Sequence, residues 1–221
     1  PIFADLKRAL AQRYSAEDPA ALVAHARCAL PLVQIPPRGL WKGSGAPTYR
    51  LLDDWIGPGQ PALIGDEARK ELIRLYLRGF GPASAKAIAT WSGLTGLRPL
   101  LDEMLADWEL VQFEGPSGEV LVDLDGLGLA DPDQPAPVRL IAPFDHILVA
   151  QADRYRIAAD AAYRRTVTPN GRSPGFVLVD GLLAGTWRPG RGPDIDVELY
   201  SELTRAQTAE LDAEVERLRV F

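Results

Sequence analysis

The sequence has one cysteine, Cys28, and two histidines among its 221 residues. A single cysteine excludes an internal disulfide and a zinc site built from several thiolates, and it is typical of a reducing compartment. Two histidines are too few for a histidine-rich metal site. No apolar run approaches the ~20 residues that a membrane-spanning helix needs, and the given sequence shows no charged-then-apolar stretch before a small-residue cleavage site. We therefore expect a cytoplasmic protein without membrane contact.

The usual catalytic signatures are also missing. The sequence contains no G-x-G-x-x-G fingerprint, no phosphate-binding loop, no G-x-S-x-G elbow and no H-E-x-x-H pair. His25 and Cys28 are one helical turn apart, but no third group orients them for nucleophilic catalysis. Asp145 and His146 fall in an apolar run that we interpret as a strand, where a capped or hydrogen-bonded His146 is the simplest interpretation. The sequence therefore predicts no catalytic residue, no metal site and no cofactor.

The net charge of −6 is unevenly distributed along the chain. The stretch 1–57 carries +2 and the stretch 58–137 carries −7, whereas 138–192 carries +4 and 193–221 carries −5. Two stretches would therefore attract a polyanion and two would repel one.

Two stretches dense in proline and glycine, 56–65 and 129–137, mark linkers, because these residues cannot continue a helix or a central strand. They divide the chain into three predicted domains, 1–57, 66–130 and 138–221. Met104 is the only methionine, so we expect that the natural protein has an N-terminal portion before Pro1.

The stretch 66–130 has the clearest pattern. An apolar face predicts a first helix that ends near Gly79, and Pro82 is suited to begin a second. A third helix is predicted to bury one face, made of Leu97, Leu100, Leu101, Met104, Leu105 and Trp108. Two strand-like runs over 109–124 surround a Gly-Pro-Ser-Gly turn. Three helices followed by a β-hairpin are typical of a winged helix.

The exposed face of that third helix opposes DNA contact. It presents Asp102, Glu103 and Asp107 against the single base Arg98. Duplex DNA carries one negative charge per roughly 1.7 Å of its axis, so this face would be repelled. A role in packing or in protein contact is the favoured interpretation of this unit.

The stretch 1–57 shows the same order of elements without an opening helix. Asp18 and Pro19 are an N-cap and first-turn pair for a helix whose inward residues are Leu22, Val23, Ala26 and Leu30. A strand, wing and strand are predicted over 32–52. Small exposed side chains on the helix, with Arg38 and Lys42 on the wing, are candidates for DNA contact; the alternative is a weakly charged surface helix.

The stretch 138–221 is rich in predicted strands. Asp180-Gly181 lies between two apolar runs and is typical of a type I′ hairpin. With the runs 138–150 and 195–200, the sheet has at least four strands, enough to curl into a barrel. A capping box at 204–207 opens a closing helix, with Leu211, Val215 and Leu218 inward and a solvated acidic outer face.

Arginines gather in this third stretch. The planar guanidinium suits phosphate oxygens, and Tyr155 and Tyr163 lie nearby, to stack or to pack. The alternative is that the arginines pair with acids of neighbouring segments. The candidate DNA-binding residues here are Arg154, Arg156, Arg164, Arg165 and Arg172.

Four motifs in order, "CALPLVQIPPRGLWKGSG", "LYLRGFGPASAKAIATWSGL", "FDHILVAQADRYRI" and "GFVLVDGLLAGTW", resemble the winged-helix DNA-binding proteins related to the AlkZ and YcaQ DNA glycosylases. The resemblance implies tandem winged helices and a barrel-like domain that form a concave DNA-binding surface in a bacterial protein. It implies excision of alkylated or cross-linked bases, through a Gln-x-Gln or Gln-x-Asp motif in an upstream winged helix. Gln34 and Gln112 lie on predicted wing strands and do not fit that role.

The sequence therefore predicts an α+β chain, with tandem winged-helix units followed by a small β-rich, barrel-like domain. Its expected role is the DNA-binding C-terminal part of a glycosylase-like protein, with double-stranded DNA as partner and no activity by itself. Two alternatives remain: a non-catalytic winged-helix DNA-binding or regulatory protein, and a protein-interaction scaffold. The oligomeric state is open.

Overall fold

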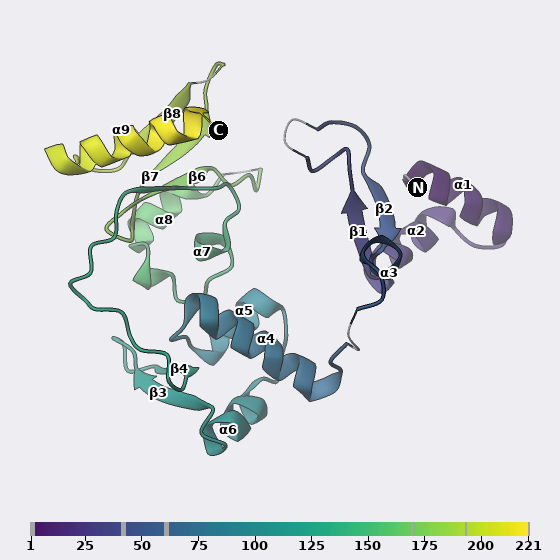
Figure 1. Cartoon of the computed structure of the whole chain (residues 1–221), viewed down its shortest axis with the longest axis horizontal. Helices are drawn as coiled ribbons and strands as arrows, with labels where there is room; N and C mark the ends of the chain where they lie inside the picture. Colours follow the sequence, from purple (N-terminus) through teal and green to yellow (C-terminus); the bar gives the residue numbers. More distant parts are fainter. Residues whose placement is uncertain (1–2, 41–42, 60–61, 169, 193, 221) are drawn as a thin grey trace. The chain divides into compact units, whose positions relative to one another are not determined.

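A computed structural model describes residues 3–40, 43–59, 62–168, 170–192 and 194–220 (Figure 1). They form a mixed α+β chain with helices, two antiparallel hairpins and one four-stranded antiparallel sheet. The chain divides between Leu63 and Ile64 into two compact units, which are described separately. Among the described residues, no helix has the length and hydropathy to cross a membrane.

The first unit has little buried interior. Its elements are α1 (Phe3–Arg13), α2 (Pro19–Ala29), β1 (Leu32–Ile35), β2 (Thr48–Leu51) and α3 (Leu52–Ile56). No described residue of these three helices is fully buried. Apolar side chains of α1, α2 and the β1–β2 hairpin instead line an open cavity of about 910 Å³.

The N-cap predicted for α2 is confirmed, because the Asp18 carboxylate accepts a hydrogen bond from the Ala20 amide at 2.9 Å. Leu22, Val23 and Ala26 are half-buried as predicted, whereas Leu30 is exposed. The prediction for Leu30 is wrong because α2 ends at Ala29, and extended backbone at Leu30 turns its side chain off the helical face.

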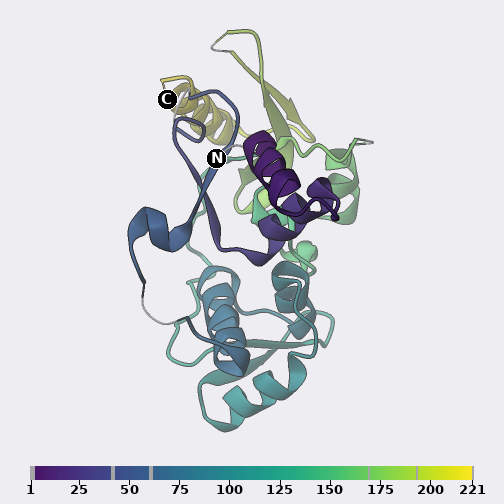
Figure 2. The ribbon, with the colours of Figure 1, turned by 90° about the vertical axis from the view of Figure 1, so that its right-hand side faces the viewer.

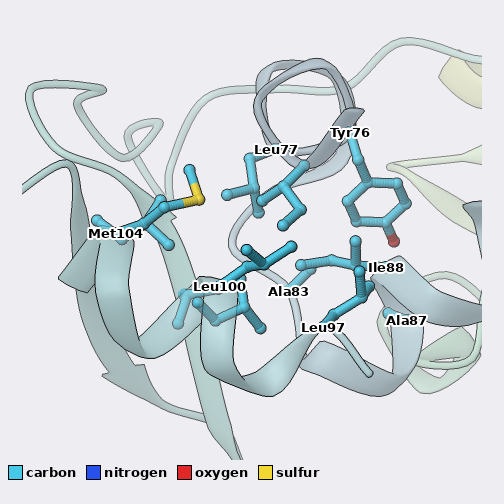
Figure 3. Close-up of a cluster of buried hydrophobic side chains, with 12 residues drawn as sticks. Tyr76, Leu77, Ala83, Ala87, Ile88, Leu97, Leu100 and Met104 are labelled. Atoms are coloured by element: carbon cyan, nitrogen blue, oxygen red, sulfur yellow. The ribbon is translucent and has the colours of Figure 1, made fainter. Parts of the chain in front are cut away.

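The second unit begins with three helices and a hairpin: α4 (Gly65–Phe80), α5 (Ala85–Ser92), α6 (Arg98–Ala106), β3 (Leu110–Glu114) and β4 (Val120–Leu124). The helices lie around the hairpin (Figure 1, Figure 2). Apolar residues at helical spacing on α4, α5 and α6 meet in one buried cluster (Figure 3). Met104 and Ile73 are fully buried there.

The second helix does not start at Pro82, as the sequence suggested. Its N-cap is Ser84, whose hydroxyl accepts a hydrogen bond from the Ala87 amide at 3.1 Å. A side-chain oxygen at the N-cap satisfies a helix N–H that would otherwise lack a partner, so the helix begins at Ala85.

Trp108 does not belong to the buried face of α6, contrary to the prediction from helical spacing. The helix ends at Ala106, and Trp108 takes a positive φ of 60° that directs its side chain to solvent, where it is 84% exposed. The Glu109 amide closes the end by donating to the Met104 carbonyl at 2.9 Å. Trp108 thus occupies a left-handed C-terminal position that normally favours glycine.

We expect Trp108→Gly to raise the free energy of unfolding by about 1 kcal/mol, because glycine adopts positive φ without a Cβ clash. Gly93 is the matched control, since it ends α5 with φ 71° and a Cβ there would meet no atom within 4 Å. Gly93→Ala should therefore destabilise by a similar amount. Urea denaturation measures both changes, and a destabilising Trp108→Gly would contradict the explanation.

The second unit continues as a sheet with helices. Its strands are β5 (Arg139–Ile141), β6 (Gly175–Val179), β7 (Leu182–Pro189) and β8 (Ile195–Leu199), and its helices are α7 (His146–Val149), the 3₁₀ turn η1 (Arg154–Arg156), α8 (Asp160–Thr166) and α9 (Arg205–Val220). The strands pair in the order β5-β6-β7-β8. Asp180 and Gly181 both have positive φ, which confirms the predicted two-residue hairpin.

The sheet does not close into the expected barrel: it is open, with β5 and β8 at its edges. Helix α9 lies beside β5 instead of a further strand. The carboxylates of Glu210 and Glu214 accept hydrogen bonds from the Val138 and Leu140 amides at 3.0 and 3.4 Å. Since these amides face away from β6, the two glutamates satisfy a free strand edge. The acidic face of α9 is therefore only partly solvated.

The capping box that opens α9 is confirmed: the Gln207 side chain accepts from the Thr204 amide at 3.0 Å, and the Thr204 hydroxyl accepts from the Gln207 amide at 3.2 Å. Leu211 is buried, and Val215 and Leu218 are half-buried.

The run 138–150 is a strand only over β5. Asp145 caps α7 by accepting from the Ile147 amide at 2.9 Å, so His146 lies on a short helix and the strand prediction is wrong there. A side-chain cap competes successfully with strand pairing at this point. His146 Nδ1 accepts a hydrogen bond from the Trp91 indole at 2.9 Å, which confirms the hydrogen-bonded interpretation.

Candidate nucleic-acid interface

The predicted arginines of the second unit lie on η1, on the last turn of α8 and in the segment that follows. Arg154 and Arg156 are held by neighbouring structure. The Arg154 guanidinium lies 4.5 Å from the Tyr163 ring centroid, and its Nε donates to the Leu148 carbonyl at 3.3 Å. Arg156 donates to the carbonyls of Phe80 and Pro82. Both side chains therefore stabilise the fold and offer only part of their donors to a ligand.

Tyr155 remains 45% exposed, but a hydrogen bond anchors its side chain. Its hydroxyl donates to the carboxylate of Glu119, beside the β3–β4 turn. Partial burial, with this hydrogen bond, raises the pKa of Tyr155 to about 12. The same hydrogen bond lowers the pKa of Glu119. The phenol consequently stays protonated over the physiological range.

Arg164, Arg165 and Arg172 are exposed, and they differ in their partners. Arg165 forms an ion pair with Glu198 at 2.8 Å and lies 3.8 Å from the Tyr200 ring centroid. Arg164 is 79% exposed and reaches Asp160 only at 4.0 Å. The alternative interpretation was that these arginines pair with acids. Arg165 does form a close ion pair, whereas Arg164 has only a long contact with an acid.

The two predicted residues of the first unit lie in the segment between β1 and β2. Arg38 is exposed, and its Nη1 donates to the Gly45 carbonyl at 3.2 Å. Lys42 lies outside the described residues. On α2, the side chains predicted to face outward are indeed exposed: Ala20, Ala21, Ala24, His25 and Arg27.

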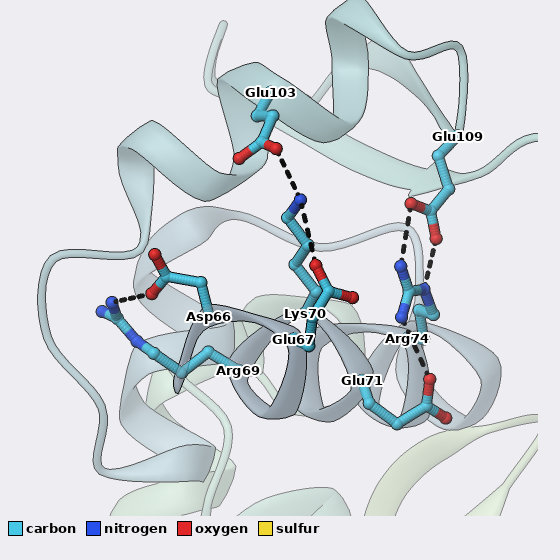
Figure 4. A network of polar contacts seen from close by, with 8 residues as sticks. All are labelled: Asp66, Glu67, Arg69, Lys70, Glu71, Arg74, Glu103 and Glu109. Atoms are coloured by element: carbon cyan, nitrogen blue, oxygen red, sulfur yellow. Dashed lines mark hydrogen bonds and ion pairs between the residues drawn. The ribbon is translucent and has the colours of Figure 1, made fainter. Parts of the chain in front are cut away.

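The acids of α6 are partly neutralised by α4 (Figure 4). Lys70, only 8% exposed, contacts Glu103 at 2.7 Å and Glu67 at 3.7 Å. Arg74 donates two hydrogen bonds to Glu109, which lower the pKa of that carboxyl. Asp102 has only an exposed contact with Arg98 at 3.7 Å. The acids of α6 and its C-cap that remain exposed without a close cationic partner among the described residues are therefore Asp102 and Asp107.

Gln151 and Asp153 join the sheet-containing part of the second unit to its three helices, and sequence reasoning missed both. The Tyr76 hydroxyl donates to Gln151 Oε1, and Gln151 is 6% exposed. The Asp153 carboxylate accepts from the Ser84 amide and hydroxyl at 3.2 Å each. The only sequence signal at this position was that the two polar residues form a Gln-x-Asp pair. Their hydrogen-bond partners could not be identified from the sequence, because they lie 75 and 69 positions away.

The described residues assemble no metal site. No group of three or more histidine, cysteine, aspartate or glutamate side chains within them is placed to hold a metal ion. Gln34 lies on β1 and donates to the Arg38 carbonyl at 3.2 Å, while Gln112 is exposed on β3. His25 and Cys28 are both exposed on α2.

Comparison with known proteins relates this arrangement to DNA repair. The model of the AlkZ-like DNA glycosylase family matches residues 2–221. Among solved structures, the chain is similar to the Streptomyces sahachiroi DNA glycosylase AlkZ, with 20% sequence identity and a TM-score of 0.69. That match covers 97% of this chain and 62% of AlkZ, so the chain spans less than two thirds of the length of that protein. A comparison with curated proteins gave no match. Because the family match extends over nearly the whole sequence, the chain belongs to the AlkZ-like DNA glycosylase family.

Proposed function

We propose that this chain is the DNA-binding part of a bacterial glycosylase that removes alkylated or cross-linked bases from double-stranded DNA. We also propose that 1–57 and 66–130 are winged-helix units and that 138–221 is a third, β-rich domain. Family membership supports the reaction class. The helix–helix–helix–hairpin order of α4 to β4 supports the assignment of a winged helix.

The observation that carries the proposal is the exposure of arginines in the third stretch. Arg164, on the last turn of α8, and Arg172, in the segment before β6, both face solvent in a chain of net charge −6. Guanidinium groups that neutralise phosphates release condensed counterions, and this release drives DNA binding. A DNA-binding protein needs such groups where it meets the duplex, while the rest of the molecule can be acidic.

The reaction of a DNA glycosylase is hydrolysis of the bond between a base nitrogen and the sugar C1′. That bond breaks, a water oxygen adds to C1′ and the base leaves with a proton. The transition state resembles an oxocarbenium ion, which nearby negative or polar groups stabilise. In our proposal this chain holds the DNA backbone in register and leaves chemistry to residues outside it, so no release of an alkylated base by this chain alone is expected.

Salt-dependent binding tests the proposal. The affinity of the purified chain for a 20-base-pair duplex should fall between 50 and 200 mM salt, with a log–log slope of about −0.9 for each phosphate contact. Fluorescence anisotropy measures the slope, and duplexes of unrelated sequence should give the same value. Absence of binding at 50 mM salt, or an affinity that salt does not change, would contradict DNA binding.

One observation favours the scaffold alternative for the three-helix part of the second unit. The exposed indole of Trp108 directly follows Asp107 at the C-terminal end of α6, the helix that carries the exposed Asp102. Such a face suits a cationic protein partner better than DNA. Binding of the chain to a partner protein with no affinity for DNA would favour this function over the first.

A further inference from the structure

The open cavity of the first unit has a mainly apolar lining that the described elements of this unit leave accessible to solvent. Phe3, Leu6 and Leu10 recur at helical spacing on α1 and line it, together with Leu22 of α2. All four side chains are only half-buried. The cavity measures about 910 Å³. Apolar surface of this extent, left exposed by the unit that carries it, marks a site of interaction.

The short helix α3 borders this cavity and exposes further apolar side chains. The Leu52 amide donates to the Pro31 carbonyl at 2.8 Å, which holds the start of α3 beside β1 (Figure 1). Asp54 lines the cavity, whereas the next two residues, Trp55 and Ile56, are 45% and 67% exposed. The first unit therefore combines an apolar cavity with an exposed apolar helix at its border. Large apolar side chains such as these form the centre of protein interfaces.

Two side chains of opposite charge line the cavity: Arg50 on β2 and Asp54 on α3. Both are exposed, and neither forms an ion pair with another residue that the structure describes. The Arg50 guanidinium lies instead 6.0 Å from the Trp55 ring centroid. A cation and an anion in the same lining are self-complementary, because a two-fold axis can place each of them opposite its counter-ion in a second copy.

We infer that this cavity is a homodimer interface, in which α3 of each copy enters the cavity of the other and Arg50 of one copy pairs with Asp54 of the second copy. The inference goes beyond the proposed DNA binding and does not depend on it. The stretch 1–57 carries only +2, the smallest net charge of the four stretches, so two copies repel each other least there. The mainly apolar lining does not suit DNA, whose phosphates would lose water there without enough donors in exchange.

Sedimentation equilibrium of the full chain tests the inference. The unmodified protein should be dimeric at about 100 µM, because interfaces of ordinary size bind in the micromolar range or more tightly. Arg50→Asp places like charges opposite each other in both contacts of the dimer, and so does Asp54→Arg. Each variant alone should therefore weaken dimerisation by roughly tenfold or more. Both positions are exposed, so the substitutions should leave folding intact.

An equimolar mixture of the two variants restores opposite charges in both contacts, so it should recover most of the lost affinity as a mixed dimer. Arg8→Asp is the matched control, because Arg8 is exposed on α1 and does not line the cavity. This variant should dimerise like the unmodified protein.

Three results would overturn the inference: an unmodified protein that is monomeric at the same concentration, variants that dimerise normally, or a mixture that associates no more tightly than either variant. A monomer that binds the apolar dye anilinonaphthalene sulfonate would further show that the cavity is accessible and that its natural occupant is not a second copy. Such results would leave the proposed DNA binding untouched, because that proposal rests on arginines of the second unit.

Discussion

Replacing Tyr76 by alanine is expected to lower the free energy of unfolding of the second unit by about 3 to 5 kcal/mol, the cost of removing a buried aromatic ring. Tyr76 is 1% exposed on α4, and its ring centroid lies 5.2 Å from that of Phe80 and 5.3 Å from that of Trp91. The substitution also removes the donor to Gln151 Oε1, a buried oxygen that has no other donor among the residues that the structure describes. Urea denaturation followed by tryptophan fluorescence measures the loss.

Tyr76→Phe separates the two contributions, because it keeps the ring and removes only the hydroxyl. It should cost about 1 to 3 kcal/mol, the penalty for an unsatisfied buried polar group. Gln151 is sensitive to this change, since its Nε2 already lacks a hydrogen-bond partner among the described residues. If alanine proves no more destabilising than phenylalanine at this position, the ring does not contribute as its packing implies.

Replacing Arg164 and Arg165 together by alanine is expected to flatten the salt dependence of duplex binding, by roughly 1 to 2 in log–log slope. Each arginine that neutralises a phosphate contributes about 0.9 to that slope. The single variants should differ. Arg164→Ala should account for most of the loss, because Arg164 is 79% exposed, whereas Arg165 is paired with Glu198.

Asp102→Ala is the matched control, because it removes a charge of the opposite sign from a different helix. Asp102 is exposed on α6, and its removal should leave DNA binding unchanged or slightly tighter. Glu103 is unsuitable as a control because its loss would leave the nearly buried Lys70 without its closest partner. If the arginine pair can be removed without effect while Asp102→Ala abolishes binding of a folded protein, the DNA-facing surface has been assigned to the wrong part of the chain.

Local rules of the sequence determined the individual elements. The Asp18 cap, the Thr204–Gln207 capping box and the Asp180-Gly181 hairpin depend on residues within four positions of each other. Their geometry is therefore set by backbone preferences that the sequence shows directly. The apolar stripe of α6 is visible in the same way as far as Met104, and it fails at Trp108 because helical spacing says nothing of where a helix ends.

Contacts between distant residues were decided only by the tertiary structure. Whether an arginine is free or paired depends on the strand or helix that packs beside it: Glu198 reaches Arg165 across 33 positions. The open sheet has the same kind of cause, since α9 brings Glu210 within 3.0 Å of an amide 72 positions earlier. Composition and periodicity record which side chains are present and which face they share, but the pairing of charges and donors is settled only when packing brings those faces together.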